Sequence, residues 1–395
     1  MSRVSLKDRL RAVALIAPLA IFLAVFFIWP LWTMIDVAVR NDAISGGLPE
    51  TAAVIGSWDG ESVPDQEIQQ ALMRDFRDAS SADLGAAIRT LNSQVSGFRT
   101  LASRTTKAAS EWNGTDPVDL TAVDPRWGDP RFWAAIQKSL APYTDRNLLA
   151  SLDLTRNEQG EVVSMPAGAS ANTLIITRTF TIAGTVTLLC ALIGLPYAML
   201  AASVTGWKRN ALLIAVLIPL WTSLLVRTAA WVILLQNEGM INKLMMWLGL
   251  IDAPIPLIFN RTGVIIAMTH VLLPFMVLPI YSVISTIPPN LMSAAASMGA
   301  PPLRAFWRVL LPLSMPGVLA GSLLVFMVAI GYYITPALVG GSNDQMISSI
   351  IAFYALQTAN WGMAGALGII LLVVTTVLYL IYGRLSRSGA PATGV

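Results

Sequence analysis

The chain has 395 residues, of which 55% are hydrophobic and only 12% are charged, and its formal net charge is +3. An ordinary soluble domain carries about 25% charged residues, so this composition excludes a soluble cytosolic enzyme and indicates a membrane protein. The charges are unevenly placed, because residues 41–172 hold 18 of the 23 acidic residues but only 11 of the 26 basic residues.

A helix that spans a bilayer needs about 20 mostly apolar residues, and six segments of the chain meet this requirement. They are residues 12–35, 174–203, 210–235, 262–286, 313–337 and 362–383. The first segment has a longer apolar core than a secretory signal peptide, and no clean small-residue cleavage site follows it. We therefore expect it to be retained, in an all-α protein that crosses the membrane six times.

The basic residues predict which helix ends face the cytoplasm, because Lys and Arg are enriched in cytoplasmic loops. Ten of the fifteen basic residues outside the acidic insert lie at the chain ends or in the segments 204–209 and 287–312. We therefore expect both termini inside the cell and the insert outside. The expected domains are 1–40 (N-terminus and first helix), 41–172 (external helical insert), 173–384 (core with helices two to six and the loop 287–312) and 385–395 (cytoplasmic tail).

The insert at 41–172 has the pattern of a small helical domain. Asp65 and Ser80 are residue types that begin helices. Apolar residues from Leu84 to Phe98 recur at spacings of three and four, which predicts one continuous helix face. Two roles stay open: a cap that packs on the bundle, or a docking surface for a partner.

The loop at 287–312 contains a helix–turn–helix pattern. We predict a short helix over 291–298, which Gly299 ends in a left-handed turn. The prolines at 301–302 suit the first turn of a second helix. Two short helices of small and apolar residues, joined by a turn on a cytoplasmic loop, are suited to inserting into a groove on another protein.

The second helix of this loop is predicted to be amphipathic. Arg304 and Arg308 lie four residues apart and share one face, and Pro312 is predicted to end the helix before the fifth span. The alternative interpretation of the loop is an ordinary amphipathic linker that lies on the membrane surface.

At this loop the sequence resembles the binding-protein-dependent ABC importer permeases. Ser293, Ala294, Ala295, Gly299 and the Val-Leu-Leu-Pro sequence ending at Pro312 match the spacing of that family's EAA loop. The resemblance implies that the loop is the coupling helix that docks on an ABC ATPase subunit. One residue departs from the family pattern, since Ser293 stands where a Glu is usual.

A second segment, residues 219–231, resembles the third span of spermidine/putrescine-type permeases, specifically the first of their two permease subunits. The resemblance covers the first span and most of residues 174–384. It implies a type I importer permease in a bacterial inner membrane, paired with a second permease and served by a periplasmic solute-binding protein. A polyamine is the implied substrate, and another small solute is the alternative. The insert is much longer than the family's external loop.

Five residues are candidates for the substrate pathway. Arg227 lies within an apolar segment, where an ionisable residue is a functional candidate, although near the outer interface an Arg also serves as an anchor. Glu238 and Asp344 are outward acids that attract a cationic substrate, pair with a docked binding protein, or are simply solvated. Trp221 and Trp231 belong to the segment that carries the permease resemblance.

The sequence predicts a transport subunit rather than an enzyme. It contains no phosphate-binding loop and no zinc-protease motif, so ATP hydrolysis requires a separate chain. Its single cysteine, Cys190, and single histidine, His270, leave no basis for a disulfide, a metal site or another cofactor. We expect His270 to form a hydrogen bond inside the bundle, and we expect no nucleic-acid partner.

Two rival functions come from other classes. An ion-driven secondary transporter usually has inverted repeats and acidic residues at the membrane midplane, and neither is visible in the sequence. A sensor or scaffold whose external insert binds a ligand would need a cytoplasmic output domain, and only a short tail follows the last span. The loop at 287–312 favours the importer over both.

Overall fold

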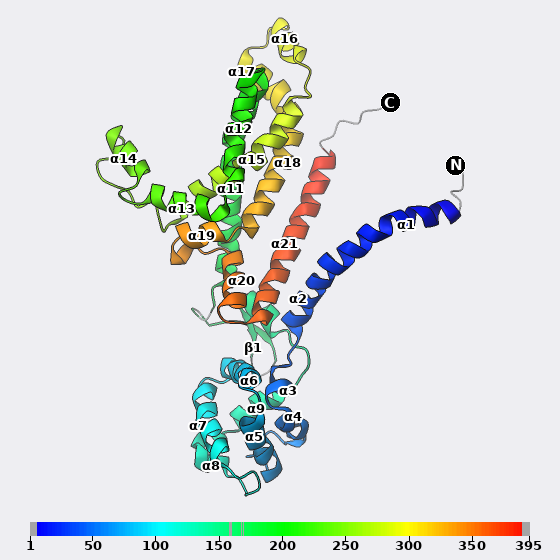
Figure 1. Ribbon diagram of the computed structural model, residues 1–395, viewed down its shortest axis with the longest axis vertical. Coiled ribbons are helices and arrows are strands. Elements are labelled where there is room, and N and C mark those ends of the chain that lie inside the picture. Colours follow the sequence, from blue (N-terminus) through cyan, green and yellow to red (C-terminus); the bar gives the residue numbers. More distant parts are fainter. Residues whose placement is uncertain (1–5, 158–159, 167, 169, 389–395) are drawn as a thin grey trace. The chain divides into compact units, whose positions relative to one another are not determined.

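The computed structural model of the chain is built almost entirely of helices (Figure 1). It describes residues 6–157, 160–166, 168 and 170–388. Residues 1–5 of the expected N-terminal segment, four residues late in the insert and residues 389–395 of the expected tail lie outside the described residues.

The chain divides into two compact units, one ending at Asn147 and the other starting at Leu148. Over the described residues, five helices are long and apolar enough to cross a membrane, or six if one bent pair counts as a single span. This agrees with a multi-pass, all-α membrane protein.

The first unit starts with an apolar helix that passes through a π turn. The elements are α1 (Leu6–Leu23), η1 (Ala24–Ile28) and α2 (Trp29–Val39). Pro30 has no backbone N–H to donate to the preceding turn, and directly before it the N–H of Trp29 bonds to the carbonyl of Ala24. The wider turn allows the helix to continue across the proline.

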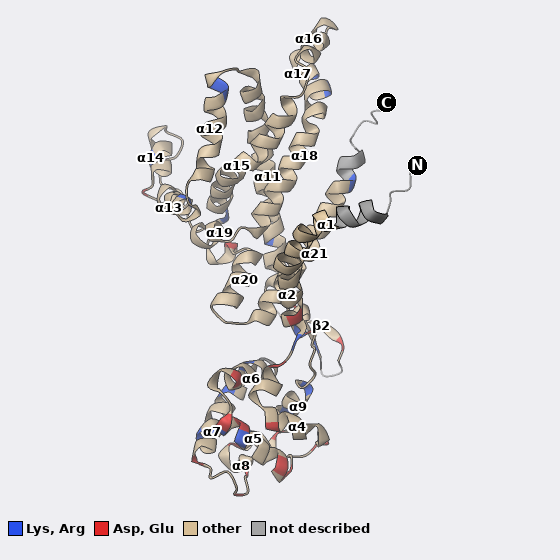
Figure 2. Cartoon of the chain, turned by 45° about the vertical axis from the view of Figure 1, so that its right-hand side comes forward, with Lys and Arg blue, Asp and Glu red and all other residues tan. Residues whose placement is uncertain are grey.

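A small helical domain follows in the same unit. Its elements are α3 (Ala43–Gly47), α4 (Pro49–Val54), η2 (Ile55–Ser57), α5 (Gln66–Asp78), α6 (Ser81–Gln94), α7 (Phe98–Glu111), α8 (Leu120–Val123), η3 (Pro125–Gly128) and α9 (Pro130–Lys138). The ribbon of Figure 2 is coloured by residue type, and it shows acidic and basic residues distributed over these helices, whereas the helices of the second unit carry few.

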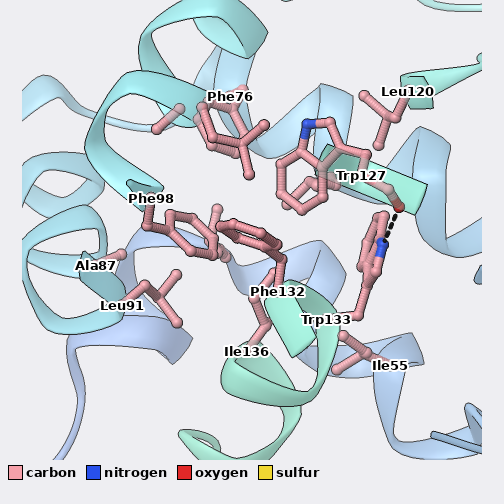
Figure 3. Packing of buried hydrophobic residues seen from close by; sticks show 14 of the residues in the cluster. Ile55, Phe76, Ala87, Leu91, Phe98, Leu120, Trp127, Phe132, Trp133 and Ile136 are labelled. Carbon is pink, nitrogen blue, oxygen red and sulfur yellow. Dashed lines mark hydrogen bonds between the residues drawn. The ribbon is translucent and has the colours of Figure 1, made fainter. Parts of the chain in front are cut away.

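Aromatic rings form the centre of this helical domain (Figure 3). The indole of Trp127 meets the ring of Phe98 edge-on and lies 4.7 Å, centroid to centroid, from that of Trp133. Trp127 Nε1 donates to Thr105 Oγ1 at 3.0 Å, and Trp133 Nε1 donates to the carbonyl of Trp127 at 2.9 Å. Both buried indoles therefore have hydrogen-bond partners, which removes the free-energy cost of burying their N–H groups.

The helix starts predicted in the insert are confirmed, but the continuous helix face is wrong. Asp65 and Ser80 cap α5 and α6, and each side chain accepts a backbone N–H of the first turn. The stripe that ends at Phe98 crosses a break, because Gly97 has φ +93° and separates α6 from α7. Both helices turn their apolar residues to one core, which preserves the periodic pattern across the break.

Asp124 is the charged group that the domain buries most completely, with only 2% of its side chain exposed. It accepts from Arg126 Nη2 at 2.8 Å and from Arg104 Nη1 at 3.0 Å. The hydrogen bonds from Arg126 hold the pKa of this carboxyl well below its ordinary value. Its ionised form therefore stabilises the folded domain.

Near its start the second unit has a short hairpin, and an aspartate just before the hairpin caps a long helix. After α10 (Arg146–Ser151), β1 (Leu154–Arg156) pairs antiparallel with β2 (Val162–Ser164). Before the hairpin, the Asp153 carboxylate accepts the backbone N–H groups of Asn172 and Thr173, both at 2.9 Å. These are the first donors of α11, which have no partner within the helix.

The remaining elements are mostly apolar helices. They are α11 (Asn172–Ser203), α12 (Trp207–Trp221), α13 (Leu224–Leu235), α14 (Met240–Trp247), α15 (Arg261–Ile284), α16 (Asn290–Ser297), α17 (Pro302–Ala305), η4 (Phe306–Leu310), α18 (Leu311–Gly331), α19 (Ile334–Val339), η5 (Ser342–Asp344), α20 (Ile347–Leu356) and α21 (Trp361–Ser388). In Figure 1, α11, α15 and α18 run alongside one another and form the centre of this unit.

Glycines let these three helices approach closely. A Cβ added at Gly194 of α11 would lie 2.9 Å from Met276 of α15, and one at Gly321 of α18 would lie 2.8 Å from the Met276 sulfur. At Gly317, the added atom would lie 2.9 Å from the backbone of Ile280. Small residues at such contacts are the usual means of packing helices in lipid.

The third expected span, 210–235, is not one straight helix. α12 ends at Trp221, α13 starts at Leu224, and the chain bends by 99° between them. Pro219 removes a helical donor near the bend, and the Ser223 side chain begins the new helix by accepting the N–H of Val226. The apolar composition is that of a span, but it does not reveal this local change of direction.

We expect Asp124→Asn to lower the free energy of unfolding by about 1–3 kcal/mol at neutral pH, since it removes charged hydrogen bonds. The pKa of Asp124 is lower in the folded chain than its ordinary 3.8. Its ionised form therefore makes its full contribution to the free energy of unfolding above pH 3.8. The contribution is lost as the pH falls below it. Thermal unfolding of the detergent-purified chain, followed by tryptophan fluorescence, measures both effects. The exposed Asp78→Asn is the matched control, and an equal loss in the control would contradict the prediction.

Candidate functional site

The helix–turn–helix predicted around Gly299 is present. α16 covers Asn290–Ser297, and Gly299 has φ +81°. The N–H of Gly299 donates to the carbonyl of Ala296 at 2.9 Å, and that of Ala300 donates to Ala295 at 3.0 Å. A Cβ added at Gly299 meets nothing within 4 Å, so the glycine is required for its left-handed backbone rather than for space.

The prediction that Pro312 ends the second helix is wrong. Residues Pro302–Gly331 form one continuous helix that passes through the π turn η4. The N–H of Leu311 bonds to the carbonyl of Phe306, and Pro312 follows directly. A π turn directly before a proline also occurs at Pro30. Here it allows the second helix of the loop to continue into the membrane-spanning helix without a break.

The two helices of the loop border an open surface cavity of about 270 Å³. Its lining includes Ala295 of α16, Gly299 of the turn, and Arg304 and Arg308 of the second helix. Of the predicted loop residues, these four come together. Ser293 and Ala294 lie exposed on α16, and Pro312 does not line this cavity.

A second site surrounds the break between α12 and α13. Arg227 folds back across the break, where its Nη2 donates to the carbonyl of Thr222 at 2.8 Å and its Nε to the Thr222 hydroxyl at 3.3 Å. The Arg227 guanidinium also lies near the hydroxyl of Tyr332, at the end of α18. The guanidinium therefore satisfies a carbonyl that the bend has removed from the helical pattern, and it links that bend to α18.

Aromatic and hydroxyl groups extend this site. Trp231 Nε1 donates to His270 Nδ1 at 3.2 Å, and the two rings lie 5.3 Å apart, edge to face. The hydroxyls of Thr228 and Thr335 are 3.2 Å apart and join α13 to α19. His270 forms the expected hydrogen bond, but it is exposed on this chain rather than enclosed in the bundle.

The other candidate pathway residues lie elsewhere. Asp344 is 13% exposed at its side chain and pairs with Arg261 at 3.4 Å. Glu238 is exposed in the turn between α13 and α14. Trp221 is 72% exposed at the end of α12. Arg227 and Trp231 thus lie one turn apart on α13 with partners on α18 and α15, but the structure does not gather the five candidates into one site.

Sequence analysis missed Tyr332, Thr335 and Arg261 as partners in these sites. Tyr332 has the position of an ordinary interfacial aromatic residue, and no sequence spacing connects it with Arg227. The pair Arg261–Asp344 joins residues 83 positions apart. Only the tertiary packing of α13 and α15 with α19, η5 and the end of α18 brings these partners together.

The fold and these sites define the class of the chain: a multi-pass α-helical membrane protein with a helix–turn–helix loop suited to docking. Residues 194–388 match the model of a family described as "Binding-protein-dependent transport system inner membrane component". The chain is 38% identical to the spermidine/putrescine transport system permease protein PotB of Escherichia coli over 201 residues, which are 51% of the chain and 73% of the relative.

Two further proteins are similar to parts of the chain. PotB of Haemophilus influenzae is 34% identical over 213 residues, which are 54% of the chain and 74% of that protein. The solved bacterial alginate ABC transporter contains a chain that is 22% identical, with 58% of this chain and 82% of that chain covered and a TM-score of 0.47.

The chain belongs to the binding-protein-dependent transport system inner membrane components, the permease subunits of ABC importers. Permeases of this family work with a separate ATPase and a binding protein. The chain is therefore a membrane transport subunit and not an enzyme.

We expect Arg227→Lys to lower the free energy of unfolding by about 1 kcal/mol, because one ammonium cannot reach both Thr222 and Tyr332 in the planar, forked geometry of a guanidinium. We expect solute uptake to fall in the same variant. Thermal unfolding and uptake are measured together, with the exposed Arg209→Lys as control. Unchanged stability and uptake in Arg227→Lys would show that only its positive charge matters.

Proposed function

We propose that this permease moves a polyamine, such as spermidine or putrescine, from a periplasmic binding protein into the cytoplasm. Its similarity to the spermidine/putrescine permeases over most of their length is the observation that carries this proposal. Another small solute is the alternative substrate, since family membership defines the transport machinery more closely than its cargo.

The proposed assembly contains three partners besides the lipid membrane. A heterodimer with a second permease encloses the pathway, because one chain of this kind supplies a single docking loop to an ATPase that has two sites. The loop at 287–312 contacts the ATPase, and a periplasmic binding protein delivers the solute. Both termini lie in the cytoplasm and the helical insert lies outside, in keeping with the basic residues of the loops and ends.

The proposed mechanism is a shift between two arrangements of the helices. ATP binding closes the ATPase pair and moves the two docked loops together, which favours the outward-facing state by differential binding. Because Pro302–Gly331 is one continuous helix, a displacement of the loop reaches α18 without an intervening hinge. Arg227 connects α18, through Tyr332, to the bend after α12.

We place Trp221, Arg227, Trp231, Glu238 and Asp344 at the outer part of the pathway. Trp231 offers an aromatic face to an alkylammonium group. Glu238 is an exposed carboxylate that attracts cations. Asp344 is paired with Arg261, so its role is to hold α15 against the segment after α19.

The substrate proposal is tested by uptake of labelled putrescine and spermidine in cells that lack their own polyamine importers. We expect uptake when the chain is expressed with its second permease, ATPase and binding protein. Omitting the chain should abolish it. If the same complex takes up a different solute but no polyamine, the importer assignment stands and the polyamine assignment is wrong.

The coupling proposal is tested with Gly299→Val. A β-branched residue in the left-handed region costs about 1–2 kcal/mol or more, so we expect the turn to distort and ATP-driven uptake to fall. Membrane insertion should persist. Mass spectrometry of proteins that co-purify with the tagged chain, with and without residues 293–312, identifies the ATPase and shows whether the loop holds it. Wild-type uptake in Gly299→Val would contradict the coupling role.

A further inference from the structure

The docking loop has a charge of one sign only. Residues 287–312 contain two basic residues, Arg304 and Arg308, and no acidic residue. Ser293 contributes no charge, and its backbone carbonyl accepts the Ser297 hydroxyl at 3.0 Å. The surface that this loop presents to a partner is therefore positive.

Neither arginine is neutralised by the part of the chain that the structure describes. Both side chains are exposed, and among the described residues no carboxylate lies within ion-pair distance of either. Exposed guanidiniums retain their full donor capacity, with five N–H groups each in a planar fork.

The two arginines also share a defined recess. Both line the open cavity of about 270 Å³ beside the loop helices, together with Ala295, Gly299 and Ala300. The small residues leave space for a side chain to enter, and Met298 beside them is 82% exposed. Two neighbouring guanidiniums beside an apolar edge suit a partner protein that presents an acidic side chain surrounded by apolar surface.

Resting on the proposed docking of this loop, we infer that the ATPase inserts carboxylate side chains at this recess, where they pair with Arg304 and Arg308. Opposite charges across an interface increase the association rate and fix the register of the partners. The competing occupant is the phosphate layer of the inner leaflet, which attracts basic loops in general. A lipid surface does not require the recess walled by Ala295 and Gly299, and this favours the protein partner.

The test uses the full complex of the chain, its second permease and the ATPase identified by co-purification. The apparent Kd of the ATPase for the detergent-purified permease pair is measured for wild type, for Arg304→Glu/Arg308→Glu, and for the neutral Arg304→Gln/Arg308→Gln. Lys208→Glu/Arg209→Glu is the matched control, since these two exposed basic residues lie together in the first turn of α12. Retention of the second permease shows that each variant is folded.

We expect the double Glu variant to weaken ATPase binding by about tenfold or more, the double Gln variant to weaken it less, and the control to bind like wild type. Replacing the ATPase carboxylate that cross-links nearest to this recess with Lys should restore binding to the double Glu variant. High salt should reduce the difference between wild type and the Gln variant.

Three results would overturn the inference, and each identifies what failed. If the double Glu variant binds normally while Gly299→Val does not, the loop docks but its charge is irrelevant. If neither change affects binding, the proposed docking itself is wrong. If the control loses as much binding as the double Glu variant, the arginines act through the lipid surface or through topology.

Discussion

The packing of Met276 is the contact on which the permease core depends. Its side chain lies where a Cβ on either Gly194 or Gly321 would collide with it, so the glycines of α11 and α18 let both helices pack closely on α15. In lipid, apolar burial gives no net drive for helices to associate, and close van der Waals contact must replace it. The sites at the bend and at the loop are attached to these three helices.

A second constraint is that backbone groups within a membrane need partners inside the protein. The chain meets it in two ways. At Pro30 and Pro312 a π turn redirects the helical hydrogen bonds around the missing N–H. At the bend after α12 the helix breaks completely, and Arg227 donates to the freed carbonyl of Thr222. An arginine in this position is thus part of the backbone's own hydrogen bonding, whatever it also does for a solute.

Sequence reasoning succeeded where the controlling interaction is local. The caps at Asp65 and Ser80 and the left-handed turn at Gly299 each depend on a few neighbouring residues, and each was predicted correctly. The sequence-based predictions failed where one residue pattern is compatible with several backbone conformations. Periodicity could not reveal the break at Gly97, and a proline alone did not distinguish a helix end from a π turn at Pro312. The contact between Arg227 and Tyr332 depends on tertiary packing, which no spacing in the sequence reports.

The helical insert has an apolar core with packed aromatic rings, capped helices and a buried ion pair, and it has no disulfide. The single cysteine of the chain, Cys190, lies in α11, so the insert contains none. Small domains outside the cytoplasm often rely on disulfides to offset the entropy of folding. In this insert, the cluster around Trp127 and Trp133 and the buried Asp124 provide that stability. If the insert lies outside, as proposed, its folding there requires no thiol-oxidising enzyme, because it has no cysteine to oxidise.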